Sequence, residues 1–170
     1  PSFLFRTISG VGDKEALGII FLFAAFYFYV VAVKTEYKYG YLYGLVSGIF
    51  TAILGSIWGG VNFIFLILGL TTLVRAMLHN IGRKEFYSYV CWWFTTFLLL
   101  NIFYPNYYGF KSIIISFTSQ ITLIALVAGL VHLIINELNI LNLREKLKAD
   151  KYPIVIISAI LFGLFGLIFF

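Results

Sequence analysis

Long apolar stretches separated by short polar links make up almost the whole of this chain of 170 residues. A helix needs about 20 apolar residues, and at least roughly 17, to cross the hydrocarbon of a bilayer. Most of the stretches meet that length, and a backbone in lipid must satisfy its own hydrogen bonds, so each stretch predicts a membrane-spanning helix. The six predicted helices cover residues 16–33, 41–57, 61–78, 87–100, 113–135 and 153–170.

Composition supports the same fold class. Hydrophobic residues make up 62% of the chain and charged residues 11%, which is more apolar surface than a soluble domain can bury. We therefore expect an all-α, polytopic transmembrane helix bundle. The net charge of +5 does not indicate a surface for nucleic acid, because the basic residues are spread over short links. The single cysteine, Cys91, excludes an internal disulfide and a cysteine-based metal site.

Further patterns concern how the helices pack and connect. Gly44 and Gly48 have the four-residue spacing that lets helix backbones approach each other closely. Residues 101–111 are rich in tyrosine and predict a loop at the membrane interface. Residues 136–152 are polar with a partly amphipathic leucine pattern, and we expect them to lie along the membrane surface. His132 stands alone in an apolar stretch, where a hydrogen-bonded packing role is the expectation.

The basic residues are distributed unevenly between the two ends of the predicted helices. Cytoplasmic links of membrane proteins are enriched in lysine and arginine. If the link after the first helix is cytoplasmic, three basic residues lie outside, namely Arg6, Lys14 and Lys111. Those on the cytoplasmic side are Lys34, Lys38, Arg75, Arg83, Lys84, Arg144, Lys146, Lys148 and Lys151. The outer face is then predicted to carry Asp13, the Trp58-Gly59-Gly60 break and the tyrosine-rich link.

The residues best suited to catalysis or metal binding come just before the first apolar stretch. Residues 6–17, Arg-Thr-Ile-Ser-Gly-Val-Gly-Asp-Lys-Glu-Ala-Leu, combine one arginine, two glycines and two carboxylates. In an extended or turned backbone Asp13 and Glu15 can share one cation, whereas in a helix they point about 200° apart. Helix capping by Asp13, with Glu15 at the positive end of the helix dipole, is the simpler interpretation. Arg6 could equally be an interfacial anchor.

This stretch resembles the second acidic motif of oligosaccharyltransferase catalytic subunits, in which an Arg-(Thr/Ser)-x-(Ser/Ala)-Gly run leads into Asp-x-Asp or Asp-x-Glu at the start of a transmembrane helix. Trp58-Gly59-Gly60 is a second point of resemblance, because the family has such a break in a short outer loop at this place. A tight turn with an interfacial tryptophan also explains those three residues. The resemblance covers residues 1–170 in outline. It implies a middle section of the transmembrane domain of a larger membrane glycosyltransferase of the GT-C type, for which we expect an archaeal source.

The resemblance also implies a chemistry. An oligosaccharide passes from a lipid-pyrophosphate donor to the asparagine of an Asn-x-Ser/Thr sequence, with Mg2+ or Mn2+ held between carboxylates on the outer face. Asp13 would be a direct ligand, and Glu15 either a second ligand or a supporting group. Arg6 would balance these carboxylates or hold the donor phosphates. Trp58 and Gly59 would border the donor groove, where glycine amides can approach a pyrophosphate.

By the same resemblance, the family's first acidic motif would precede Pro1, and its Trp-Trp-Asp-Tyr-Gly motif, in a soluble C-terminal domain, would follow Phe170. This chain alone is therefore expected to be inactive, and to belong to the cell membrane, or to the endoplasmic reticulum in a eukaryote. Two alternatives stay open. One is a non-enzymatic membrane module, such as an accessory subunit or part of a transporter. The other is a different lipid-linked sugar transferase, which would lack the Arg-to-Asp-x-Glu spacing.

Overall fold

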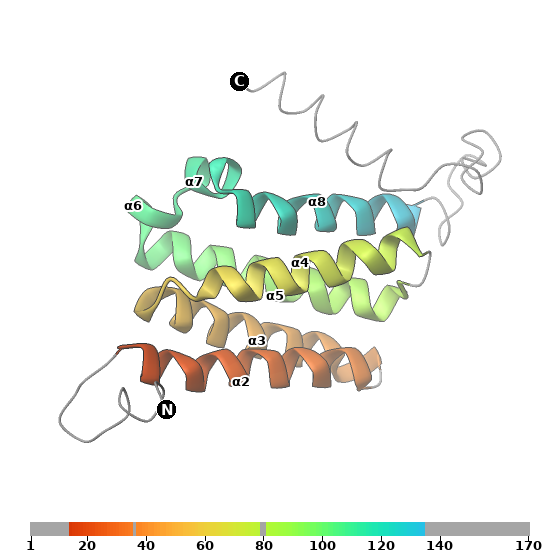
Figure 1. Cartoon of the computed structure of the whole chain (residues 1–170). Coiled ribbons are helices and arrows are strands. Elements are labelled where there is room, and N and C mark those ends of the chain that lie inside the picture. The colour runs from red at the N-terminus through yellow and green to blue at the C-terminus, as the bar shows by residue number, and fades with distance from the viewer. Residues whose placement is uncertain (1–13, 36, 79–80, 135–170) are drawn as a thin grey trace.

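The computed structural model describes residues 14–35, 37–78 and 81–134, and these form helices joined by short turns, with no strand among them. Five longer helices lie roughly parallel, side by side, and two short ones lie together at one end (Figure 1). The elements are α2 (Lys14–Lys34), α3 (Tyr37–Ile57), α4 (Val61–Met77), α5 (Arg83–Phe103), α6 (Pro105–Tyr108), α7 (Phe110–Ile115) and α8 (Phe117–His132).

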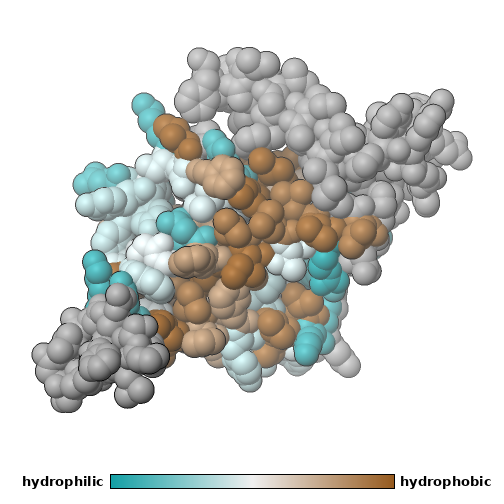
Figure 2. Space-filling view, viewed as in Figure 1, coloured by the Kyte–Doolittle hydropathy of each residue, from teal (hydrophilic) through white to brown (hydrophobic). Residues whose placement is uncertain are grey.

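The described helices have the length and surface of membrane spans. Residues 14–34, 39–57 and 83–103 are long and apolar enough to cross a bilayer, while α4 and α8 are apolar but shorter. Figure 2 shows apolar side chains over the middle of one face and most hydrophilic ones toward its ends. One face of α2 exposes Leu17, Ile20, Phe23, Tyr27 and Val30. Such an outward apolar stripe suits lipid rather than water. The predicted all-α transmembrane class is confirmed for these residues.

Hydroxyl groups join the helices across their buried interfaces. The Ser47 Oγ of α3 donates to the carbonyl of Ala25 on α2 at 2.7 Å. The Tyr89 hydroxyl of α5 donates to the carbonyl of Thr122 on α8 at 2.9 Å. Within a membrane, small residues and interhelical hydrogen bonds are what hold helices together, since lipid is as apolar as the helices themselves. The hydroxyl-rich interfaces are therefore a main source of specificity in the packing.

The close approach predicted from Gly44 and Gly48 is confirmed between α3 and α5. A Cβ atom added at Gly44 would lie 2.5 Å from the Ser88 carbonyl oxygen, and one added at Gly48 would lie 2.8 Å from that of Trp92. Both contacts are with backbone atoms, which cannot move aside as a flexible side chain can. The Trp92 ring is fully buried beside them, and its Nε1 donates to the Thr51 hydroxyl at 3.0 Å.

Several predicted boundaries were wrong. The second helix begins at Tyr37 rather than near residue 41, and the fourth covers Arg83–Phe103 rather than 87–100. Polar residues at a helix end do not stop a helix, because they reach toward the membrane surface from its last turns. The tyrosine-rich link is largely helical, since α5 continues to Phe103 and α6 and α7 follow directly.

The fifth predicted segment, residues 113–135, is interrupted. Ser116 is extended, with φ −70° and ψ 124°, between the end of α7 and the start of α8. Serine favours the position before a helix, and the three isoleucines of residues 113–115 are weak helix formers. The sixth predicted segment, residues 153–170, and the polar stretch 136–152 lie outside the described residues.

Candidate functional site

The two ends of the bundle differ in the residues that they bring together. One end, here called the glycine-turn end, holds the start of α2 with Glu15, the turn at residues 58–60, and α6 with Tyr107 (Figure 1). The other, the ion-pair end, holds the end of α4 with Arg75 and the start of α5 with Lys84. Trp58 and Tyr107 thus lie at the end opposite Lys84, which is the arrangement that the basic residues predicted.

Of the two acidic residues Asp13 and Glu15, the structure describes Glu15. It is the second residue of α2 and is half-buried, in the first turn, where a carboxylate suits the helix dipole. Arg6 and Asp13 lie outside the described residues. Within residues 14–35, 37–78 and 81–134, no group of three or more His, Cys, Asp or Glu side chains could hold a metal. Glu15 offers oxygen of the kind that hard divalent cations prefer, and a site would need Asp13 and further ligands.

Trp58 packs inward at the glycine-turn end. A Cβ atom at Gly18 of α2 would lie 3.1 Å from its Cε3, and one at Gly60 would lie 2.2 Å from the same atom. Position 60 is helical, with φ −60° and ψ −10°, so glycine is needed there for space and not for its backbone angles. Gly59 is exposed, and a Cβ there would meet nothing within 4 Å. The turn therefore combines a packed tryptophan with an accessible backbone.

The hydrogen bonds of this turn run into α4. The amides of Val61, Asn62 and Phe63 donate to the carbonyls of Trp58, Gly59 and Gly60 at 3.3, 3.3 and 3.0 Å. Trans peptide groups hold N–H and C=O on opposite sides. The amides of Gly59 and Gly60 consequently point away from α4, toward the end of the bundle, where the positive end of a helix dipole favours anions.

Sequence reasoning missed a polar side-chain link beside this turn. The Asn62 Nδ2 donates to the Gly59 carbonyl at 3.1 Å, and the Thr118 hydroxyl of α8 donates to the Asn62 Oδ1 at 2.7 Å. The Ser116 and Thr118 hydroxyls are 3.3 Å apart. A polar residue near the start of an apolar segment, as Asn62 is, could have indicated a buried or interhelical hydrogen bond. Its partner is 56 residues away and could not be inferred from spacing.

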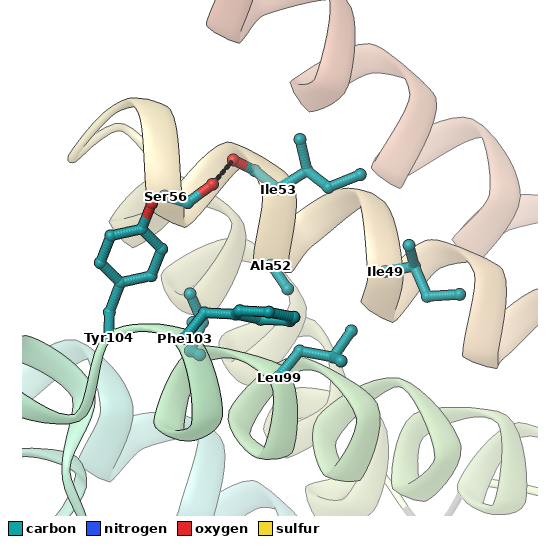
Figure 3. A pocket seen from close by; sticks show the side chains of 8 residues that line it. Ile49, Ala52, Ile53, Ser56, Leu99, Phe103 and Tyr104 are labelled. Atoms are coloured by element: carbon teal, nitrogen blue, oxygen red, sulfur yellow. Dashed lines mark hydrogen bonds between the residues drawn. The ribbon is translucent and has the colours of Figure 1, made fainter.

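An apolar groove of about 570 Å3 lies between α3 and α5 near the same end (Figure 3). Phe103 lies across it, and Ser56 and Tyr104 stand together at one limit. Ser56 donates to the carbonyl of Ile53 at 2.7 Å and precedes Trp58 by two residues. The full lining is Ile49, Ala52, Ile53, Ser56, Leu99, Leu100, Phe103 and Tyr104. The groove is therefore a hydrocarbon-like slot that ends close to the glycine turn.

The short helix α6 is anchored to this end by Tyr108. Its hydroxyl donates to the Gly55 carbonyl at 3.4 Å, and its own carbonyl accepts from the Asn101 Nδ2 at 3.3 Å. Partial burial raises the pKa of the Tyr108 hydroxyl above its usual value. Tyr107, by contrast, is 78% exposed, as expected of an interfacial tyrosine.

The ion-pair end is closed by opposite charges. The Arg75 Nη2 and Glu85 Oε1 are 2.6 Å apart, and the Gly82 amide donates to the Glu85 Oε2 at 3.2 Å. The pair joins the last turn of α4 to the first turn of α5, and it was not predicted from the sequence. His132, the last residue of α8, is buried at this end, which agrees with packing, while its predicted hydrogen bonding stays a prediction.

Comparison with known proteins identifies one family. The family model of the oligosaccharyl transferase STT3, N-terminal, matches residues 1–165 of the chain. No curated protein and no solved structure matches it. The matched residues include both the 6–17 stretch and the 58–60 turn.

Proposed function

Because the chain belongs to the oligosaccharyl transferase STT3 N-terminal family, we propose that it is part of the catalytic subunit that transfers an oligosaccharide from a lipid-linked pyrophosphate donor to asparagine in Asn-x-Ser/Thr sequences. The observation that carries this proposal is the extent of the family match, 1–165, over nearly the whole chain. The membrane-spanning helices support it, because a lipid-linked donor has to be met at a bilayer surface.

The donor is proposed to bind at the glycine-turn end. The α3–α5 groove offers an apolar slot for part of its hydrocarbon chain, and it ends near Trp58 and Gly59. Gly59 is exposed and its amide points away from α4, an orientation that suits a phosphate oxygen. Trp58, packed on Gly18 and Gly60, would border the site and hold the turn in place. Binding the lipid in the groove would bring its pyrophosphate to the outer surface of the membrane.

The polar stretch before α2 is proposed to complete the site. Asp13 and Glu15 would supply carboxylate oxygens to Mg2+ or Mn2+, and Arg6 would balance them or hold the phosphates. A bound cation would stabilise the charge that develops as pyrophosphate leaves. Two carboxylates are too few for a complete site, so further ligands must come from elsewhere in the enzyme, and the isolated chain is expected to be inactive.

The test is glycopeptide formation by a complete enzyme containing this chain, measured against Mn2+ concentration for the wild type and Asp13→Asn. Asparagine caps a helix about as well as aspartate but lacks the charge that holds a hard cation. We expect activity to fall by orders of magnitude and to recover in part with excess Mn2+. Glu15→Gln should lose less activity if Glu15 only supports the site.

If Asp13 is only a cap, its replacement by alanine costs about 1 kcal/mol of helix stability and should leave turnover nearly unchanged. An Asp13→Asn enzyme that equals the wild type at limiting Mn2+, with equal expression, would contradict the catalytic role.

A further inference from the structure

Asn62 forms a bridge between two segments that are remote in sequence. Its Nδ2 donates to the Gly59 carbonyl at 3.1 Å, and its Oδ1 accepts from the Thr118 hydroxyl at 2.7 Å. Both distances lie in the range of well-formed hydrogen bonds. Because both ends of its amide are engaged, the Asn62 side chain is held in one orientation. The bridge links the 58–60 turn of α3–α4 to the first turn of α8.

The bridge determines how the peptide group between Gly59 and Gly60 is oriented. The Gly59 carbonyl accepts from the Asn62 backbone amide at 3.3 Å, a longer distance than the 3.1 Å to the side-chain Nδ2. A Cβ added at Gly59 would meet nothing within 4 Å, so side-chain packing on that side does not fix the turn. Since the peptide group is planar and trans, fixing its carbonyl holds the whole group in place and limits rotation of the adjoining Trp58–Gly59 peptide, whose amide faces the proposed donor site. Side-chain hydrogen bonds thus supply rigidity that a glycine turn otherwise lacks.

The bridge is continuous with the break between α7 and α8. The Thr118 hydroxyl is 3.3 Å from that of Ser116, the extended residue at the break. The Ser116 carbonyl in turn accepts from the Gln120 amide at 2.9 Å, in the first turn of α8. A displacement of α8 would therefore also move the glycine turn, because Thr118 and Asn62 connect the two by hydrogen bonds.

We propose that Asn62, held by Thr118, is a positioning residue that keeps the Trp58-Gly59-Gly60 turn in the orientation that receives the donor pyrophosphate. This inference rests on the proposed function, which places the donor at that turn. Asn62 itself need not contact the donor. Loss of the bridge lets the turn rotate, so the donor binds less well, while the acceptor peptide and the chemical step are affected much less.

The experiment measures the KM values of the complete enzyme for a lipid-pyrophosphate oligosaccharide and for an Asn-x-Thr peptide, together with kcat. Thr118→Val removes the hydroxyl at nearly constant volume, and we expect the donor KM to rise about 3- to 10-fold, the loss of roughly one hydrogen bond. Asn62→Asp keeps the acceptor for Thr118 but lacks the donor to Gly59, so it should raise the donor KM at least as much. Thr118→Ser retains the hydroxyl and should restore a value near that of the wild type.

Thr71→Val is the matched control, because the Thr71 hydroxyl donates to the Ile67 carbonyl within α4, away from the turn. It should leave the donor KM unchanged. An unchanged donor KM in Thr118→Val, or an equal change in the acceptor KM, would overturn the inference.

Trp58→Ala separates this outcome from a failure of the proposed function. If Trp58→Ala raises the donor KM and Thr118→Val does not, the positioning role is wrong and the donor site stands. If neither substitution changes the donor KM, the placement of the donor at this turn is wrong and the positioning role falls with it.

Discussion

The two ends of the bundle close their turns by different chemistry. At the ion-pair end, Arg75 of α4 and Glu85 of α5 meet at 2.6 Å, and the Gly82 amide adds a bond to the same carboxylate. At the glycine-turn end, the described residues close the 58–60 turn with uncharged groups: the Trp58 ring and the Asn62 amide. One end is thus held by charge and the other by packing and neutral hydrogen bonds.

The difference shows which charges are committed to the fold. A cation and an anion that pair with each other are poorly suited to bind a charged ligand, so Arg75 and Glu85 are best explained as structural. Trp58, Gly59 and Gly60 carry no charge, so the turn itself adds no repulsion against an anion at the exposed Gly59. This contrast agrees with the proposed donor site.

The largest expected effect comes from adding a methyl group at Gly60, with Gly82 at the other end for comparison. Gly60→Ala would place a Cβ 2.2 Å from the Trp58 ring and should lower the free energy of unfolding by about 1–3 kcal/mol, the usual cost of overpacking. Gly82→Ala is the matched control, because a Cβ there meets nothing within 4 Å. Thermal unfolding of the purified protein in detergent checks both. Equal destabilisation by the two substitutions would remove the distinction between the ends.

An intermediate effect is expected at the ion pair. Arg75 is 35% and Glu85 21% exposed, so Arg75→Gln should lower the free energy of unfolding by about 1 kcal/mol, as for other partly exposed pairs. Lys34→Gln, an exposed residue at the same end, is the control and should change little. In the complete enzyme the donor KM should stay constant in Arg75→Gln. A rise comparable to that of Trp58→Ala would mean that the ion-pair end also serves the donor.

The smallest effect concerns Tyr108. Tyr108→Phe removes the 3.4 Å bond to Gly55 and should lower stability by less than about 1 kcal/mol at neutral pH. The pKa of Tyr108 is raised above its usual 10.0, so its stabilising contribution is complete below pH 10 and is lost as pH rises through the folded-state value. The loss of stability above pH 10 should be smaller in Tyr108→Phe than in the wild type, as followed by unfolding at a series of alkaline pH values. An identical alkaline loss in both would show that the burial of Tyr108 is unimportant.

How much of the fold and of the candidate site could be predicted depends on how far apart in sequence the interacting residues lie. Apolar runs predicted the helices, and the Gly44 and Gly48 spacing predicted a close contact, because both signals are local. The family could be identified from two short motifs. The interruption at Ser116 has no proline or glycine to mark it. The Asn62–Thr118 bond spans 56 residues and depends on how α4 and α8 pack, which no local pattern encodes. The roles of Arg6, Asp13 and Glu15 stay predictions.

We propose that the two ends of the bundle face opposite sides of the membrane, with the glycine-turn end outside. This orientation is tested most directly by cysteine labelling in intact cells with a reagent that cannot cross the membrane. In a chain whose Cys91 is replaced by alanine, single cysteines are introduced at Tyr107, which is exposed in α6, and at Lys84, near the start of α5. We expect position 107 to react and position 84 to react only after the membrane is opened. Equal labelling of the two positions in intact cells, or labelling of position 84 alone, would contradict the account.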